Sequence, residues 1–324
     1  MAILNNGLVP VHPLTLVPNY RAGTNIYLWN EERASTVKFL AGEQLVTEGV
    51  FGYFAANPHQ QIFVAEACFE SYRQHLLEHI DTWLAEPRVP RILKTTVTAE
   101  CMHALLTNSY GQRSISELIT TCIDCSERLV RYAPQIQING RDLQRSLRHD
   151  SGFVCHAVNT AIYVYLITKT LGYGDDAIVE MCTGAMLHDV GKIHSGYLKS
   201  DSNKPFPASK DWTDRSTMTH PIDGFRRLCH QTQVTETHLM MCYQHHERID
   251  GKGFPVGLLG NELHEASRIC SVANRYDRLT SCRSNRVPIT RLAALRVMES
   301  ERNTLLDSEF FRCLDRIMSG PLTN

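Results

Sequence analysis

The feature that most constrains the fold of this chain is a helical hydrophobic repeat that begins after Pro90. Apolar residues recur every three or four positions in one segment after another, which is the spacing of one face of an α-helix. The stretch 156–171 is apolar on nearly all sides, as expected for a helix at the centre of a bundle. The pattern predicts an all-α domain over 89–324, with helices near 93–106, 114–132, 141–147, 156–171, 177–188, 220–229, 235–245, 266–279 and 290–299.

The first 88 residues show a different pattern. Short runs typical of β-strands are separated by Pro, Gly and Asn, and a helical repeat then covers 63–84. Pro87 and Pro90 mark a linker. We therefore expect a small α+β domain at 1–88, without a phosphate-binding loop or catalytic cluster, and interpret it as a regulatory or dimerising module. Its expected strands lie at 9–17, 25–29, 36–40 and 50–55.

The composition excludes several classes of protein. A formal net charge of −1 over 324 residues provides no basic field for duplex nucleic acid. No run approaches the roughly 18 apolar residues of a membrane helix, and the N-terminus lacks the basic start and apolar run of a signal peptide. The 11 cysteines are odd in number and irregularly spaced, which favours reduced thiols over a disulfide framework. We expect a cytoplasmic protein.

Histidine is concentrated in the helical half, where nine of the 15 histidines fall within 149–246. Imidazoles that converge in an apolar interior can satisfy their nitrogens by sharing a cation. Asp189 carries two oxygens and could bridge two ions about 3.5–4 Å apart. A site rich in imidazole suits iron, manganese, nickel or zinc better than magnesium. The residues that predict this site are His156, His188-Asp189, His220 and the adjacent pair His245-His246.

Each of these features alone also has a simpler interpretation. A single buried histidine such as His156 is more often a hydrogen-bonded core residue than a metal ligand. A His-Asp dipeptide can occur by chance, and the pair His245-His246 also fits a solvated helix end. The order and spacing of all the features together favour the metal site. We interpret four further histidines as ordinary surface or core residues, namely His149, His194, His230 and His238.

In combination these motifs resemble the HD superfamily of metal-dependent phosphohydrolases and, more narrowly, its HD-GYP branch, whose members degrade the bacterial messenger cyclic di-GMP. The likeness covers roughly 140–290. It implies an HD-type helical domain after the small α+β domain. The residues that carry it are His156, His188-Asp189 with Gly191-Lys192, His220-Pro221, His245-His246-Glu247-Arg248, the segment 250–255 and the segment 272–277.

The resemblance implies a centre of two divalent ions, with iron or manganese favoured and nickel or zinc as alternatives. One ion would be bound by His156, His188 and Asp189. Asp189 would bridge to a second ion held by His220, His245 and His246. Asn274 stands at a position where the family has an aspartate, and an amide oxygen is a neutral, weaker ligand.

The resemblance also implies a substrate site. Lys192 would lie near the scissile phosphate and act in catalysis together with Asp189, and Arg283 and Arg286 would bind phosphates. Gly253, Phe254 and Pro255 match the signature loop of the family, with phenylalanine in place of its tyrosine. The loop fits a role in shaping the substrate site or contacting a partner, and it fits a plain tight turn equally well.

The leading hypothesis is therefore a cyclic di-GMP phosphodiesterase that releases the linear dinucleotide pGpG, with further cleavage to GMP left open. Besides cyclic di-GMP, the partners left open are GGDEF-type or other signalling proteins and a second copy of the chain.

The chain departs from the family pattern at two positions, and the first of them supports a rival hypothesis. Asn274 removes one carboxylate, which favours a catalytically weak or inactive member that binds cyclic di-GMP or a protein. Gly152 stands where some members have a glutamate for a third metal, so we expect at most two ions. A third hypothesis, an HD hydrolase that acts on another nucleotide, is disfavoured by the histidine pair and the Gly-Phe-Pro loop.

Overall fold

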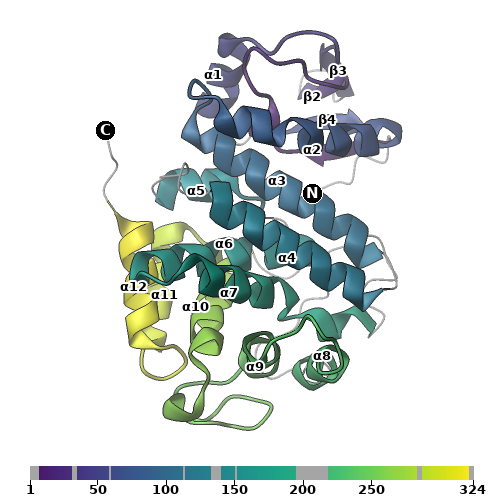
Figure 1. The fold of residues 1–324 in the computed structure, drawn as a ribbon. Helices are drawn as coiled ribbons and strands as arrows, with labels where there is room; N and C mark the ends of the chain where they lie inside the picture. The colour runs from purple at the N-terminus through teal and green to yellow at the C-terminus, as the bar shows by residue number, and fades with distance from the viewer. Residues whose placement is uncertain are drawn as a thin grey trace. The chain divides into compact units, whose positions relative to one another are not determined.

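The structure is a computed structural model that describes residues 7–30, 35–57, 60–111, 114–132, 140–149, 152–194, 218–282 and 287–320. The chain divides into two compact units. The first comprises Met1–Ala104, Tyr132–Ile138 and Arg145–Leu147, and the second comprises Leu105–Arg131, Asn139–Gln144 and Arg148–Asn324. The first unit contains the sheet, and the second is helical (Figure 1). A small α+β part followed by an all-α part, as expected from the sequence, is thus confirmed.

The first unit is built on a four-stranded antiparallel sheet in the order β1-β4-β2-β3. The β-branched and aromatic residues of β4 suit a central strand, and it pairs with β1 on one side and with β2 on the other. The described strands are β1 (Leu8–Val11), β2 (Ile26–Asn30), β3 (Ser35–Leu40) and β4 (Ile62–Ala65).

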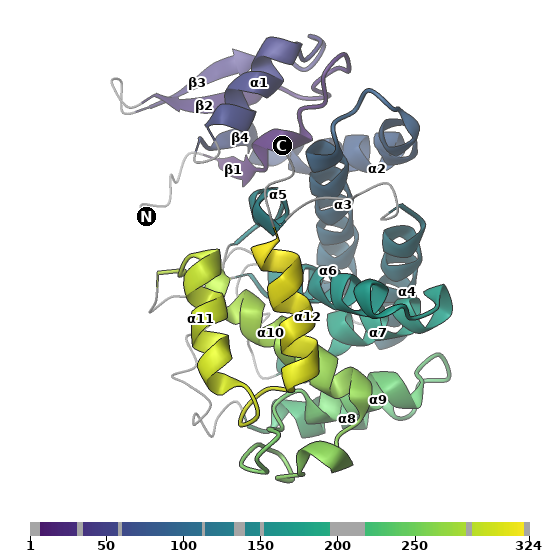
Figure 2. The same cartoon turned by 90° about the vertical axis from the view of Figure 1, so that its left-hand side faces the viewer.

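Two α-helices belong wholly to this unit, α1 (Glu48–Ala56) and α2 (Phe69–Ala85). Phe54 of α1 packs edge-to-face on Phe39 of β3, with ring centroids 5.7 Å apart, and Figure 2 shows the helix beside the strands. α2 buries its apolar face in the same core as the sheet. That face repeats at helical spacing and consists of Tyr72, Leu76, Ile80, Trp83 and Leu84.

Three of the local predictions for this unit are wrong. The strand expected at 9–17 ends at Val11, because Pro13–Thr15 forms a 3₁₀ helix that the His12 side chain caps by accepting from the Leu14 amide.

The run 50–55 was expected to be a strand, but it lies within α1. Thr47 caps that helix by accepting a hydrogen bond from the Val50 amide, and this local interaction outweighs the β-propensity of the run. The helical repeat was expected to begin at Phe63, but Ile62–Ala65 forms β4, because pairing on two sides overrides the apolar periodicity.

The second unit is a bundle around α6 (Phe153–Leu171), whose residues are nearly all buried. α7, α10 and α12 pack on α6, and α9 packs on α7, α8 and α10. Figure 2 shows α10, α11 and α12 side by side. The predicted helices are confirmed, and α12 is an addition. The remaining described α-helices include α3, of which residues 91–104 belong to the first unit. They are α3 (Arg91–Gly111), α4 (Ile115–Tyr132), α5 (Gly140–Ser146), α7 (Asp175–Leu187), α8 (His220–Leu228), α9 (Glu236–Gln244), α10 (Glu265–Thr280), α11 (Arg291–Glu301) and α12 (Ser308–Ser319).

A search of the described helices finds none with the length and apolar character needed to cross a membrane.

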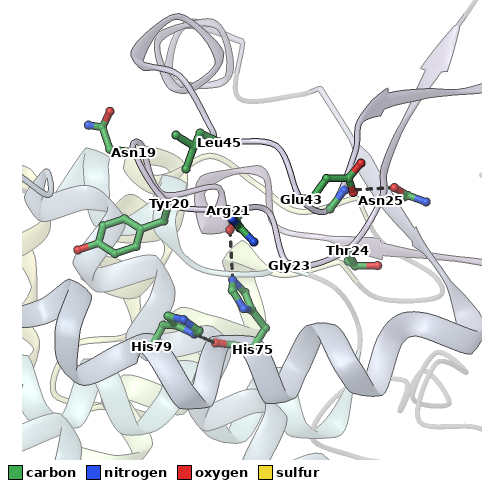
Figure 3. A pocket seen from close by; sticks show the side chains of 11 residues that line it. Asn19, Tyr20, Arg21, Gly23, Thr24, Asn25, Glu43, Leu45, His75 and His79 are labelled. Atoms are coloured by element: carbon green, nitrogen blue, oxygen red, sulfur yellow. Dashed lines mark hydrogen bonds between the residues drawn. The ribbon is translucent and has the colours of Figure 1, made fainter.

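An open pocket of about 760 Å³ lies in the first unit, between the loops that precede β2 and α1 and one face of α2 (Figure 3). His75 donates from Nε2 to the Arg21 carbonyl, and His79 contributes a second imidazole one turn further along the helix. None of the residues predicted to bind metal or substrate lines this pocket.

The core of the first unit can be tested with a matched pair of leucines. Leu76 is buried and Leu45 is 57% exposed. We expect Leu76→Ala to lower the free energy of unfolding by about 2–5 kcal/mol, because the substitution leaves a cavity. We expect Leu45→Ala to change it by less than about 0.5 kcal/mol. Urea unfolding followed by circular dichroism measures both, and equal effects would contradict the assignment of α2 to the core.

Candidate metal centre

Six side chains of the second unit form two groups of potential metal ligands that share one carboxylate. The first group is His156, His188 and Asp189, and the second is Asp189, His220, His245 and His246. Within each group the ligand atoms lie within 4.8 Å of one another, and every side chain is buried. The structure therefore brings together the five imidazoles and the aspartate that the sequence singled out.

His156 lies on α6 and is oriented by α10. Its Nδ1 donates to Asp277 Oδ2 over 2.6 Å. The carboxylate of Asp277 also accepts from Asn159 Nδ2 at 2.8 Å and from Ser281 Oγ at 2.9 Å. Because Nδ1 carries the proton, Nε2 of His156 keeps a lone pair for a ligand. Asp277 thus acts on the site through His156, a role that the sequence reasoning missed.

His188 and Asp189 directly follow the end of α7. Nδ1 of His188 donates to the Ala185 carbonyl over 2.6 Å, so its Nε2 carries the lone pair. This buried Nε2 has no hydrogen-bond partner among the described residues. The short 3₁₀ helix Val190–His194 then places Lys192 beside Asp189, with 2.5 Å between Nζ and Oδ2. Lys192 is itself buried, so this ion pair is shielded from solvent.

His220, the first residue of α8, reaches Asp189 because Gly191 allows a close approach of the backbones. A Cβ at position 191 would lie 1.9 Å from the His220 carbonyl oxygen. His220 Nε2 lies 3.1 Å from Asp189 Oδ1. Any side chain larger than glycine at position 191 would push α8 away from this carboxylate.

His245 and His246 follow the end of α9. Nδ1 of His245 donates to the Cys242 carbonyl over 2.9 Å, which leaves the lone pair on Nε2. That Nε2 lies 3.1 Å from Nε2 of His220. Two imidazole nitrogens at this distance are accommodated either by a hydrogen bond, with His220 donating, or by a cation between the rings. The donor set therefore fits a metal ion at this position.

The charge states of these residues at neutral pH also suit metal binding. Burial lowers the pKa of His188 and of His246 well below the usual range, and neighbouring imidazoles add to the effect. Burial and the charge of Lys192 lower the pKa of His220 to about 4. Burial raises the pKa of Asp189, but Lys192 and the imidazoles outweigh burial and hold that pKa well below its usual value. Neutral imidazoles and an ionised carboxylate are the forms that bind metal ions.

Asn274 lies on the face of α10 that meets both ligand groups. Ser271, one turn before it, donates to the His245 carbonyl, and Asp277, one turn after it, accepts from His156. The side-chain oxygen of Asn274 is buried and has no hydrogen-bond partner among the described residues. This oxygen is therefore a buried acceptor on the helix face that contacts both groups.

The signature loop after His246 is held by Glu247, a residue to which the sequence motifs assign no role. Its buried carboxylate accepts hydrogen bonds from the backbone amides of Val256, Gly257 and Leu258. A Cβ on Gly253 would lie 2.4 Å from the Glu247 Cα, so only glycine fits there. The loop thus packs tightly against the histidine pair and is more than a solvent-exposed turn.

Phe254 of this loop stacks on His246, with ring centroids 4.6 Å apart and an angle of 18° between the planes. Gly253 and Pro255 flank it in the same loop. The two arginines expected to bind phosphates, Arg283 and Arg286, lie outside the described residues.

Among the described side chains, three of the histidines interpreted as ordinary residues, His149, His230 and His238, are in neither ligand group. His238 is buried and caps α9, and its Nε2 donates to the Glu180 carbonyl. His149 donates from Nε2 to the Gln144 carbonyl, and His230 is exposed. The side chain of His194 lies outside the described residues.

A comparison with protein families matches the HD domain to residues 148–310, half of the chain. The chain belongs to the HD domain family. This family is metal-dependent, and the matched span contains every residue of the two ligand groups. The resemblance to HD-GYP proteins that the motifs indicated is confirmed by the following matches.

Curated relatives of this HD domain protein are bacterial phosphodiesterases. One is the cyclic di-GMP phosphodiesterase response regulator RpfG of Xanthomonas campestris, 27% identical over 78% of this chain and 65% of its own. A cyclic di-GMP phosphodiesterase of Pseudomonas aeruginosa is 31% identical over 48% of this chain and 37% of its own. A 3′3′-cGAMP-specific phosphodiesterase of Vibrio cholerae is 28% identical over 51% of this chain and 35% of its own. The chain thus spans between about a third and two thirds of these relatives.

Among solved structures, an HD-GYP protein from Bdellovibrio bacteriovorus shares the fold. Its TM-score is 0.69 at 17% sequence identity, and the match covers 97% of this chain and 100% of that chain. The likeness therefore extends over the α+β part as well as the helical part.

The orienting role of Asp277 predicts a loss of metal affinity when its charge is removed. We expect Asp277→Asn to weaken metal binding by about 10–100-fold, since an amide is a poorer acceptor for the Nδ1 proton of His156. Asp124→Asn, which alters a partly exposed ion pair on α4, serves as the control and should have no effect. Metal content after dialysis against graded chelator measures both variants. Unchanged affinity in Asp277→Asn would contradict the role.

The lowered histidine pKa values predict that the metal-free protein loses stability on acidification. Unfolded histidine takes up protons near pH 6.5, whereas folded His220 stays neutral until about pH 4. The unfolded state therefore binds more protons in this window, and stability falls as the pH drops through it. For His220 alone the loss reaches up to about 3 kcal/mol.

Urea unfolding of metal-free protein between these pH values measures this loss. His220→Gln should flatten the pH dependence, while His230→Gln, at an exposed position, should leave it unchanged. A slope that is identical in all three proteins would show that His220 already titrates normally in the folded state.

Proposed function

We propose that this chain is a metal-dependent phosphodiesterase that hydrolyses cyclic di-GMP to the linear dinucleotide pGpG. The observation that carries the proposal is Asp189, a buried carboxylate that belongs to two groups of imidazole ligands and pairs with a buried lysine. The names of the relatives supply the substrate class.

The donor set fits two divalent ions, which when bound would supply Lewis acidity towards a phosphodiester and towards water. His156 and His188 would hold one ion. His220, His245 and His246 would hold the other. Asp189 would contribute to both sites. Asn274 would offer its amide oxygen to the first. Nitrogen-rich ligands favour iron or manganese, with nickel or zinc as alternatives.

Lys192 supplies a fixed positive charge beside the shared carboxylate. Negative charge grows on the phosphoryl oxygens as the water oxygen bonds to phosphorus and the bond from phosphorus to the 3′ oxygen breaks. A preorganised cation in a site shielded from water stabilises that charge more effectively than solvent does. The departing 3′ oxygen takes up a proton, which completes the hydrolysis to a linear product with a 5′-phosphate.

The signature loop contributes an aromatic surface next to the centre. Because Phe254 stacks on His246, its ring both limits the movement of that ligand and borders the space beside it. We propose Gly253, Phe254 and Pro255 as one wall of the substrate site and Arg283 and Arg286 as phosphate contacts. The further cleavage of pGpG to GMP would use the same groups.

A second candidate function rests on Asn274. A neutral amide in place of a carboxylate weakens one ion site, and a protein that binds cyclic di-GMP or a signalling partner needs no turnover. We propose the first unit, built around the sheet and α2, as a regulatory or dimerising module in either case. Asn274→Asp separates the two candidates, because activity that appears only in the variant identifies the natural chain as a binder.

Turnover of cyclic dinucleotides tests the leading proposal. Purified protein loaded anaerobically with Fe²⁺ or Mn²⁺ is expected to convert cyclic di-GMP to pGpG, measured by chromatography alongside 3′3′-cGAMP and pGpG as substrates. Lys192→Met should lower kcat by about 10²–10³-fold and change KM little. Lys169→Met, at a solvent-exposed ion pair on α6, should retain full activity.

Preferential turnover of 3′3′-cGAMP would support the proposed phosphodiesterase reaction and contradict cyclic di-GMP as the preferred substrate. Absence of turnover of all three nucleotides by metal-loaded protein would contradict the proposal.

A further inference from the structure

We propose that the two ion sites are unequal and that a phosphate-bearing ligand completes the weaker one. The ion held by His220, His245, His246 and Asp189 would bind tightly on its own. The ion held by His156 and His188 would bind firmly only together with a phosphate group. This inference rests on the proposed metal centre and adds a regulatory property, the coupling of metal loading to substrate.

The first argument is the number of protein ligands. One group contributes three imidazoles besides the shared carboxylate, while the other contributes two. The remaining candidate for the smaller group is Asn274, whose buried side-chain oxygen has no hydrogen-bond partner among the described residues. An amide oxygen carries no charge, so it offsets none of the charge of a dication. The smaller group therefore has fewer metal-binding atoms than the larger group, and its additional candidate ligand adds no negative charge.

The second argument is that the other nearby carboxylates are already engaged. Asp277 accepts hydrogen bonds from His156, Asn159 and Ser281, and turning it towards an ion would leave these buried donors unsatisfied. Glu247 is committed in the same way to three backbone amides of the signature loop. Neither side chain can therefore add a carboxylate to the smaller group.

The third argument is the charge balance. Two dications and Lys192 would contact one carboxylate directly, Asp189, in a buried site. The charge of Asp277 lies on the far side of the His156 ring. Such an excess of positive charge disfavours the second ion until an anion enters. A phosphate group provides negative oxygens of the kind that hard and borderline cations bind. By linkage, phosphate must then strengthen the binding of the second ion by the same factor by which that ion strengthens the binding of phosphate.

The consequence is an enzyme whose complete centre forms with its substrate. At low concentrations of free metal, the chain would carry one ion and remain catalytically inactive. Cyclic dinucleotide would then recruit the second ion, so the rate would depend jointly on the two concentrations. An aspartate at position 274 would remove this coupling by supplying the missing charge permanently.

Calorimetric titration of metal-free protein with Mn²⁺, with and without inorganic phosphate, tests the inference without measuring activity. For the natural chain we expect one tight ion and a second bound at least about tenfold more weakly. Phosphate should strengthen the second step by about tenfold or more. Electron paramagnetic resonance provides an independent readout, because the spectrum of a coupled Mn²⁺ pair should appear at lower metal concentration when phosphate is present.

Asn274→Asp is the decisive variant and Asn25→Asp, at an exposed position of the first unit, is its matched control. We expect Asn274→Asp to bind two ions with similar affinity and to lose the effect of phosphate, while Asn25→Asp behaves as the natural chain. Circular dichroism establishes that both variants fold.

Two equally tight ions in the natural chain, or a second ion indifferent to phosphate, would overturn this inference and leave the proposed phosphodiesterase intact. Failure of every protein to bind Mn²⁺ or Fe²⁺ would overturn the proposed function as well.

Discussion

The structure of the helical unit depends on one buried carboxylate. Asp189 lies within reach of four imidazoles and one lysine, and burying its charge would be very costly without cations around it. Lys192 provides one cation. The imidazole nitrogens around Asp189 are arranged so that they could bind further cations. The ends of α7 and α9 and the first turns of α6 and α8 all converge on this carboxylate, so the packing of these helices also assembles the site.

A second layer of interactions fixes the ligands in place. Backbone carbonyls set the tautomers of His188 and His245, and Asp277 sets that of His156. Gly191 lets α8 approach the shared carboxylate. These interactions orient the imidazoles before any ion arrives, so little conformational freedom has to be lost on binding. They also engage Asp277 and Glu247 in hydrogen bonds, so Asp189 is the one described carboxylate in both candidate ligand groups.

Much of this arrangement could be predicted from the sequence because it depends on local spacing. The helices of the second unit follow from the apolar repeat, and the candidate ligands follow from the order and spacing of the histidines together with the resemblance that they carry. The partnership of His156 with Asp277 could not be predicted, since 121 residues separate them and only the packing of α6 on α10 joins them. The run 50–55 was misassigned because a single capping hydrogen bond outweighs its strand propensity. Ile62–Ala65 was misassigned because sheet pairing is a long-range property.

The central claim is that Asp189 joins two ion sites within the helical unit. Anomalous diffraction at the manganese edge, from crystals grown with Mn²⁺ and phosphate, tests it most directly. The account predicts two anomalous peaks about 3.5–4 Å apart on either side of the Asp189 carboxylate, with the peak beside His156 and His188 fading when phosphate is withdrawn. Crystals without an anomalous peak among these side chains, or with a single ion that does not touch Asp189, would contradict it.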